Sequence, residues 1–144
     1  MKSLTPYICC QDAPRAIEFY RKAFGARETM RLAEPSGKIG HAEVDIGGSI
    51  LMISDEYPDY GALSPTSIGG TPVKLHLYVD DADAVFARAI EAGAKVVRAL
   101  EDQFYGDRSG TIQDPFGHVW FVSMKKEDLT AEEVQRRYDR MMTQ

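Results

Sequence analysis

The 144-residue sequence predicts an α+β fold of two tandem βαβββ modules that form a cupped mixed sheet, followed by a C-terminal helix. The first observation is an internal repeat, in which residues 40–48 shifted by 70 positions place Glu43 on Gln113. The second is a pair of similar helical segments, residues 12–18 and residues 81–87. The whole chain is therefore expected to be a single domain made of two fused copies of one unit.

Module one is expected to span about residues 4–54. Its elements are a strand at residues 4–10, a helix from Asp12 to Gly25, and strands at residues 29–32, 41–46 and 49–53. Asp12 is a suitable N-cap, and Gly25 ends the apolar helical stripe. The last two strands are joined by Gly47-Gly48, and glycine at both turn positions permits the positive φ of a tight hairpin.

A connection at residues 55–72 is rich in Pro, Gly and Ser, so we expect no regular element there, although the segment could fold over a pocket. Module two repeats the order over about residues 73–124. Its elements are a strand at residues 73–79, a helix capped by residues 80–83, and strands at residues 96–100, 108–113 and 118–124. Thr130 and Glu133 form a capping box, which predicts a final helix over residues 130–141.

Composition narrows the class of protein. Hydrophobic content of 44% and charged content of 27% are ordinary for a globular protein, and no apolar run is long enough to span a bilayer. A net charge of −5 repels phosphate backbones, so nucleic acid is not an expected partner. Cys9 and Cys10 are neighbours on a strand and point to opposite faces, as free thiols. With no secretory signal pattern, we expect a cytoplasmic protein without a membrane partner.

Several motifs resemble those of one superfamily. D-x-x-R-A-I-E-F-Y begins at Asp12, and D-P-F-G-H begins at Asp114. With the βαβββ repeat, these motifs resemble the vicinal oxygen chelate superfamily, which includes glyoxalase I, extradiol dioxygenases, fosfomycin-modifying enzymes and bleomycin-binding proteins. Residues 37–43, 69–72, 75–79 and 105–108 resemble a bacterial branch called glyoxalase-like or bleomycin-resistance-like. The likeness covers residues 4–124, and because this fold supports many chemistries, function depends on the site.

The resemblance implies four positions at which metal-using members carry ligands. Thr5 occupies the first position, where a hydroxyl replaces the usual His. Glu43 occupies the second and is a competent oxygen ligand. Lys74 occupies the third, and its ammonium group has no lone pair for a cation, while Phe121 at the fourth cannot coordinate. We therefore expect no divalent metal at the usual site and no cofactor.

Strand alternation leaves a second arrangement open. His41 and His76 could point into the same cup as Glu43, and a relocated His41, Glu43 and His76 site would suit Zn²⁺ or Fe²⁺. In the other interpretation, the two histidines are inward polar residues that form hydrogen bonds to Glu43 or to each other and orient the carboxylate.

The remaining candidates would recognise a ligand through shape, stacking and charge. The predicted ligand-binding residues are Tyr7, His41, Glu43, Lys74, His76, Tyr105, Arg108, Gln113 and Phe121. Arg108 could clamp a carboxylate or phosphate, or instead pair with Asp107 or Glu101. Phe121 is expected to face the cup, which leaves Trp120 in the core.

Three functions follow. The first is a homodimeric small-molecule-binding protein that holds an organic ligand in the sheet cup without the usual metal. The second is a glyoxalase-type lyase or isomerase, or a dioxygenase-like enzyme, that uses the relocated metal or Glu43 as a general base. The third is an assembly role for the C-terminal helix.

Overall fold

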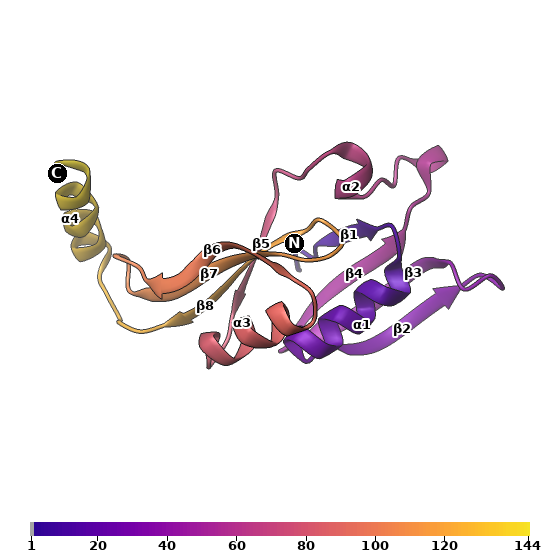
Figure 1. Cartoon of the computed structure of the whole chain (residues 1–144), viewed down its shortest axis with the longest axis horizontal. Coiled ribbons are helices and arrows are strands. Elements are labelled where there is room, and N and C mark those ends of the chain that lie inside the picture. Colours follow the sequence, from indigo (N-terminus) through magenta and orange to yellow (C-terminus); the bar gives the residue numbers. More distant parts are fainter. Residues whose placement is uncertain (1) are drawn as a thin grey trace.

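The computed structural model describes residues 2–144 and confirms two βαβββ modules and a C-terminal helix (Figure 1). Module one contains β1 (Tyr7–Cys10), α1 (Ala13–Phe24), β2 (Arg27–Ala33), β3 (Ile39–Ile46) and β4 (Ser49–Asp55). The connection contains the 3₁₀ helix η1 (Pro58–Tyr60) and the short helix α2 (Pro65–Ile68). Module two contains β5 (Lys74–Tyr78), α3 (Ala82–Glu91), β6 (Lys95–Asp102), β7 (Asp107–Gln113) and β8 (Val119–Lys125). Helix α4 (Ala131–Met142) follows.

The strands form two four-stranded mixed sheets with the same topology. Their orders are β1-β4-β3-β2 and β5-β8-β7-β6. In each sheet the first strand of the module runs parallel to the last, and the other pairs are antiparallel. The duplication seen in the sequence is therefore a duplication of sheet topology.

The strand pairing corrects one predicted correspondence between the two modules. In module one, Met52 of β4 is opposite both Tyr7 of β1 and Glu43 of β3. At the equivalent place in module two, Phe121 of β8 is opposite both His76 of β5 and Thr111 of β7. Glu43 thus corresponds to Thr111, a shift of 68 residues, and not to Gln113. The reason is turn length, because only Gly47-Gly48 separates β3 from β4, whereas residues 114–118 separate β7 from β8. A slip of two residues keeps each side chain on the same face of its strand.

The local signals at turns and helix ends are confirmed. Gly47 and Gly48 have φ values of 59° and 95°, as a primed hairpin turn requires. The Thr130 side chain caps α4 by accepting a hydrogen bond from the Glu133 amide at 3.1 Å. The expected absence of regular structure in the connection is wrong, because Pro58 and Pro65 each start a short helical turn.

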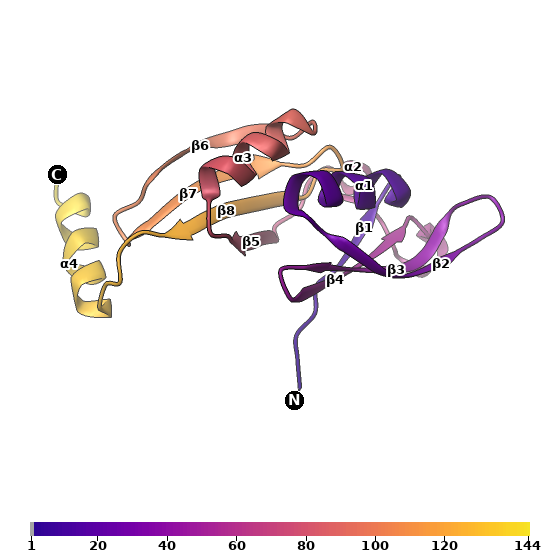
Figure 2. The same ribbon diagram turned by 90° about the horizontal axis from the view of Figure 1, so that it is seen from below.

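The two modules meet through their helices. Helices α1 and α3 pack against each other, and Figures 1 and 2 show the two sheets spread to either side of that contact. The hydroxyl of Tyr20 on α1 donates to Asp114 of module two at 2.6 Å, and the indole N–H of Trp120 donates to the same oxygen at 3.0 Å. Trp120 is buried, as the sequence predicts. One apolar core therefore spans both modules.

Each sheet has one face packed on the helices and one face directed away from them, which we call the open face. In β3, for example, Ala42 and Val44 are buried while His41 and Glu43 are partly exposed. Among the described residues, no strand of one sheet makes extensive contact with a strand of the other. The two open faces therefore do not close a cup within one chain.

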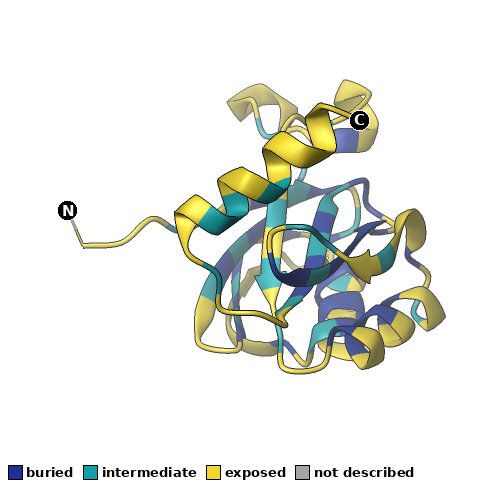
Figure 3. Ribbon diagram, turned by 90° about the vertical axis from the view of Figure 1, so that its left-hand side faces the viewer, coloured by how far each residue is buried: buried dark blue, intermediate teal, exposed yellow. Residues whose placement is uncertain are grey.

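Helix α4 lies at the far end of module two. None of its residues is buried, and Figure 3 shows its exposed length. Arg137 anchors the helix by donating to the Phe104 carbonyl at 3.2 Å and by pairing with Glu127 at 3.0 Å. No helix within residues 2–144 combines the length and the apolar character needed to cross a bilayer.

Candidate functional site

The open face of module one carries a chain of three hydrogen-bonded side chains. The phenol oxygen of Tyr7 on β1 lies 2.7 Å from Nδ1 of His41 on β3. Nε2 of His41 lies 2.8 Å from Oε2 of Glu43, two residues further along the same strand. The His41 and Glu43 side chains are 22% and 25% exposed, whereas Tyr7 is 53% exposed. The chain therefore runs from a sheltered carboxylate to an accessible phenol.

The direction of these hydrogen bonds depends on the protonation of His41, and one assignment follows for a neutral ring beside an ionised carboxylate. An ionised carboxylate only accepts, so Nε2 of His41 carries the proton that points at Glu43. In the neutral imidazole, Nδ1 is then an acceptor, and the Tyr7 hydroxyl donates to it. Of the two histidines expected to bond to Glu43 or to each other, His41 is hydrogen-bonded to Glu43, whereas His76 is bonded to Ser123.

A pocket of about 340 Å³ adjoins Tyr7, where the connection folds over the edge of the first sheet. Its lining is Tyr7, Ile8, Cys9, Ser54, Gly61, Ala62, Leu63, Pro65, Ile68, Gly70, Thr71, Pro72 and His118. Most of these side chains are apolar, and burial raises the pKa of the Cys9 thiol, which keeps it neutral. The Tyr7 phenol is thus a polar group beside a largely apolar pocket.

The open face of module two also carries hydrogen-bonded side chains. Nε2 of His76 lies 2.8 Å from Oγ of Ser123, which lies 2.6 Å from Oγ of Ser109. Separately, the Tyr78 hydroxyl donates to Asp107 at 2.6 Å, and this hydrogen bond raises the pKa of Tyr78 to about 12. Ser123 and Ser109 are buried, so this network runs from the exposed His76 into the interior of the protein.

The predicted ligand-binding residues of module two do not gather at one point. Lys74 and His76 line a cleft of about 1190 Å³ between β5 and the N-terminal part of module one, which includes Thr5. Phe121 lies on the open face, with its ring centroid 5.2 Å from that of His76. Gln113 is opposite Val119 at the end of the β7–β8 ladder.

Arg108 and Tyr105 lie away from these groups. Arg108 points to the helix side of its sheet and pairs with Asp83 at 2.9 Å and with Asp102 at 3.2 Å. The expected pairing with Asp107 or Glu101 is therefore wrong. The reason is that Arg108 lies on the α3 side of β7, next to the first turn of that helix. Tyr105 packs edge-on against Phe104 in the turn beside α4, with ring centroids 5.1 Å apart.

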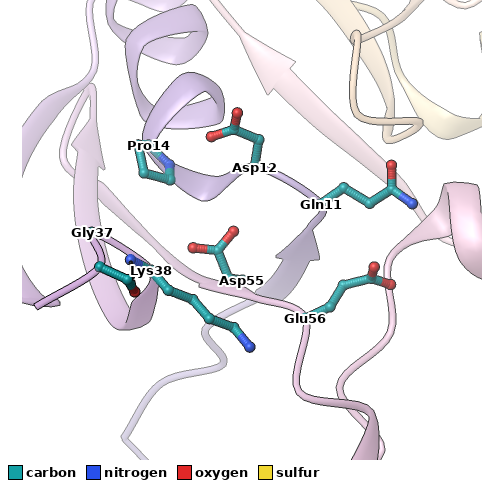
Figure 4. Close-up of a pocket in the computed structure, with 8 residues that line it drawn as sticks. Gln11, Asp12, Pro14, Gly37, Lys38, Asp55 and Glu56 are labelled. Carbon is teal, nitrogen blue, oxygen red and sulfur yellow. Dashed lines mark hydrogen bonds between the residues drawn. The ribbon is translucent and has the colours of Figure 1, made fainter. Parts of the chain in front are cut away.

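An acidic pocket of about 500 Å³ lies at the N-terminus of α1 (Figure 4). Its carboxylates have structural roles: Asp55 accepts from the Ala13 amide at 2.8 Å and from the Ile39 amide at 2.7 Å. Asp12 accepts from the Arg15 amide as the N-cap of α1. The sequence offered no motif that marked Asp55, because its partners are backbone amides distant in the chain.

The residues proposed as metal ligands do not fit a metal within one chain. His76 lies in a different sheet from His41 and Glu43, and residues 2–144 contain no group of three or more His, Cys, Asp or Glu side chains placed to hold an ion. Both ring nitrogens of His41 also face hydrogen-bond partners. A metal at this residue would have to displace Tyr7 or Glu43.

The sheet topology and the open faces agree with the class of protein that the sequence motifs resemble. A family model described as the Glyoxalase/Bleomycin resistance protein/Dioxygenase superfamily matches residues 3–122, so the chain belongs to that superfamily. An uncharacterised protein of Mycobacterium tuberculosis is 46% identical over 136 residues, covering 92% of this chain and 80% of the relative.

Solved structures show the same fold. TioX from Micromonospora sp. ML1 is 28% identical, with a TM-score of 0.67 over 90% of this chain and 100% of that one. A mutant of the fosfomycin resistance protein FosX from Listeria monocytogenes, complexed with Mn(II) and 1S,2S-dihydroxypropylphosphonic acid, is 17% identical, with a TM-score of 0.67 over 96% of this chain and 98% of FosX. The likeness to FosX concerns the fold alone.

Proposed function

We propose that this protein binds a small organic ligand against the open face of module one, without a divalent metal at the positions used by metal-dependent members of the superfamily. The observation that carries this proposal is the accessible Tyr7 phenol beside the pocket under the connection. A pocket of about 340 Å³ is within the usual range for small-molecule sites.

A second copy of the chain completes the cup. Both open faces are uncovered in a single chain, and module one exposes Met30 and Leu32 from β2. Exposed apolar groups of this kind are typical of association surfaces. In the proposed homodimer, module one of one copy faces module two of the other, so that His76, Phe121, Lys74 and Gln113 of the partner subunit meet Tyr7 across the ligand.

The enzymatic alternative with a relocated metal is less well supported, because His41 already uses both ring nitrogens. The alternative with Glu43 as a general base has better support, since its carboxylate is joined through His41 to Tyr7. The free thiols Cys9 and Cys10 suit a reducing, cytoplasmic compartment.

Light scattering combined with a thermal-shift screen tests this proposal. We expect the mass of a dimer, and a rise in melting temperature with a subset of small aromatic and carboxylic compounds. Tyr7→Phe should weaken that rise, whereas Tyr60→Phe, which alters an 88% exposed tyrosine outside the pocket, should not. A monomer would reject the homodimer, and equal responses from both variants would reject the proposed site.

Metal content is measured on the same untagged protein after incubation with Zn²⁺, Fe²⁺ or Mn²⁺ and desalting. We expect no stoichiometric metal. Retained metal that is lost in His41→Ala would reject the metal-free site and favour the relocated one.

A further inference from the structure

We infer that Glu43, His41 and Tyr7 form a proton relay whose ligand-facing group is the Tyr7 phenol oxygen, and that its ligand is a small acid with a largely apolar body: a phenol or an enolisable carbonyl compound. This inference rests on the ligand site proposed for module one. It does not depend on the dimer.

One protonation state of His41 determines what the Tyr7 oxygen can offer a ligand. Tyr7 has a single hydroxyl proton, and a neutral His41 with its proton on Nε2 directs it to Nδ1. In that state the phenol oxygen offers a ligand only lone pairs, on a residue that is 53% exposed. A ligand that meets this oxygen must supply the hydrogen, which selects O–H, N–H or acidic C–H donors.

The surrounding side chains favour an apolar body for that donor. Met30 and Met52 lie on either side of Glu43 in the ladder, and Leu32 is opposite His41. Asp45, the next acid on the open face, pairs with Arg27 at 3.6 Å, and the neighbouring Cys9 thiol is neutral because burial raises its pKa. An ammonium ligand would find Glu43 already occupied by His41, so a neutral acid is the better match.

The proton transfer balances without a co-reactant. The ligand X–H bond breaks and its proton forms a bond to the Tyr7 oxygen, while the Tyr7 proton moves to Nδ1 of His41. The resulting imidazolium donates to the Glu43 carboxylate at 2.8 Å, and the ligand keeps the electron pair as an anion. Returning the proton to another ligand atom would complete an isomerisation. Tyr7 is the catalytic residue in this step, His41 accepts the proton, and Glu43 is a positioning residue.

Nitrogen NMR of the histidine side chains in the full-length protein tests the relay without any ligand. We expect the neutral His41 ring to carry its proton on Nε2. Glu43→Gln should give a mixture of tautomers, because an amide can donate or accept. Glu34→Gln is the matched control: Glu34 contacts the Tyr57 phenol outside the site, and this change should leave His41 unaltered. A His41 ring protonated on Nδ1 in the wild-type chain would overturn the relay.

The second test uses 4-nitrophenol, whose ionised form has a separate visible absorption band. At a fixed pH, we expect the bound phenol to be about tenfold more ionised than the free phenol, and this excess to disappear in Tyr7→Phe and Glu43→Gln. Absence of binding, or equal ionisation with wild type and Tyr7→Phe, would overturn the ligand class. If other compounds stabilise wild type more than Tyr7→Phe but His41 is protonated on Nδ1, the relay fails while the binding proposal stands. Should the screen find no ligand while His41 is protonated on Nε2, the binding proposal fails instead.

Discussion

The two open faces share a sheet topology but place their polar groups differently. In module one, Tyr7 and Glu43 occupy equivalent ladder positions to His76 and Thr111 in module two. In module one the exposed residue, Tyr7 at 53%, is joined to two partly exposed side chains, whereas in module two the exposed His76 is joined to two buried hydroxyls, those of Ser123 at 0% and Ser109 at 3%.

This difference separates groups available to a ligand from groups that stabilise the fold. Buried hydroxyls that satisfy one another contribute to stability and need no ligand. An exposed oxygen whose only proton is directed inward has unused acceptor capacity. We therefore expect different consequences from substitutions in the two networks: loss of stability at the buried hydroxyls of module two, and loss of binding at Tyr7 of module one.

The largest expected effect is a loss of stability when the Asp114 carboxylate, which joins the two modules, is removed. Asp114→Ala removes the acceptor for Tyr20, Trp120 and the amides of Phe116 and His118. Leaving these buried donors unpaired should lower the free energy of unfolding by about 4 kcal/mol. Urea denaturation measures the loss, with the exposed Asp59→Ala as control. A loss below about 1 kcal/mol would show that the modules do not depend on this contact.

An intermediate effect is expected from Ser123→Ala in module two. The buried Ser109 hydroxyl would lose its partner, and His76 would lose the contact that orients its ring. We expect a loss of about 1 to 2 kcal/mol in the free energy of unfolding. The exposed Ser3→Ala serves as control. If Ser123→Ala left stability intact but removed ligand binding, the assignment of functions to the two faces would be wrong.

The smallest effect is a pH dependence carried by Tyr78. Its hydrogen bond to Asp107 raises the pKa from 10.0 to about 12 in the folded chain. Below pH 10 both folded and unfolded states keep the proton, so the stabilisation is complete there. Between pH 10 and 12 only the unfolded state releases it, so stability declines with rising pH. Urea midpoints across this range should fall more steeply for wild type than for Tyr78→Phe, and identical slopes would contradict the assignment.

The sequence predicted the elements because local rules determine them. Alternation of apolar and polar residues marks a strand such as β3, the caps at Asp12 and Thr130 begin two helices, and Gly47-Gly48 makes the tight turn. The same alternation places His41 and Glu43 on one face. Local patterns could therefore indicate that this carboxylate and this imidazole lie together.

Relations between the modules could not be predicted in this way. Alternation assigns a residue to a face of its own sheet but does not say which faces meet, so His76 was grouped with His41 although they lie in separate sheets. The partner of Arg108 could not be predicted either. Asp83 belongs to a helix that packs on the opposite face of the sheet from the expected site. The role of Asp114 depends on Tyr20, which is 94 residues distant in the chain.

That contact across the chain also bears on how the duplication can evolve. Tyr20 from the first copy donates to Asp114 of the second, and α1 packs on α3. A chain with only the second copy would keep a buried carboxylate without its phenol partner and would expose the α3 side of the shared core. The two halves have become mutually dependent, so they can no longer be inherited, lost or exchanged as separate units.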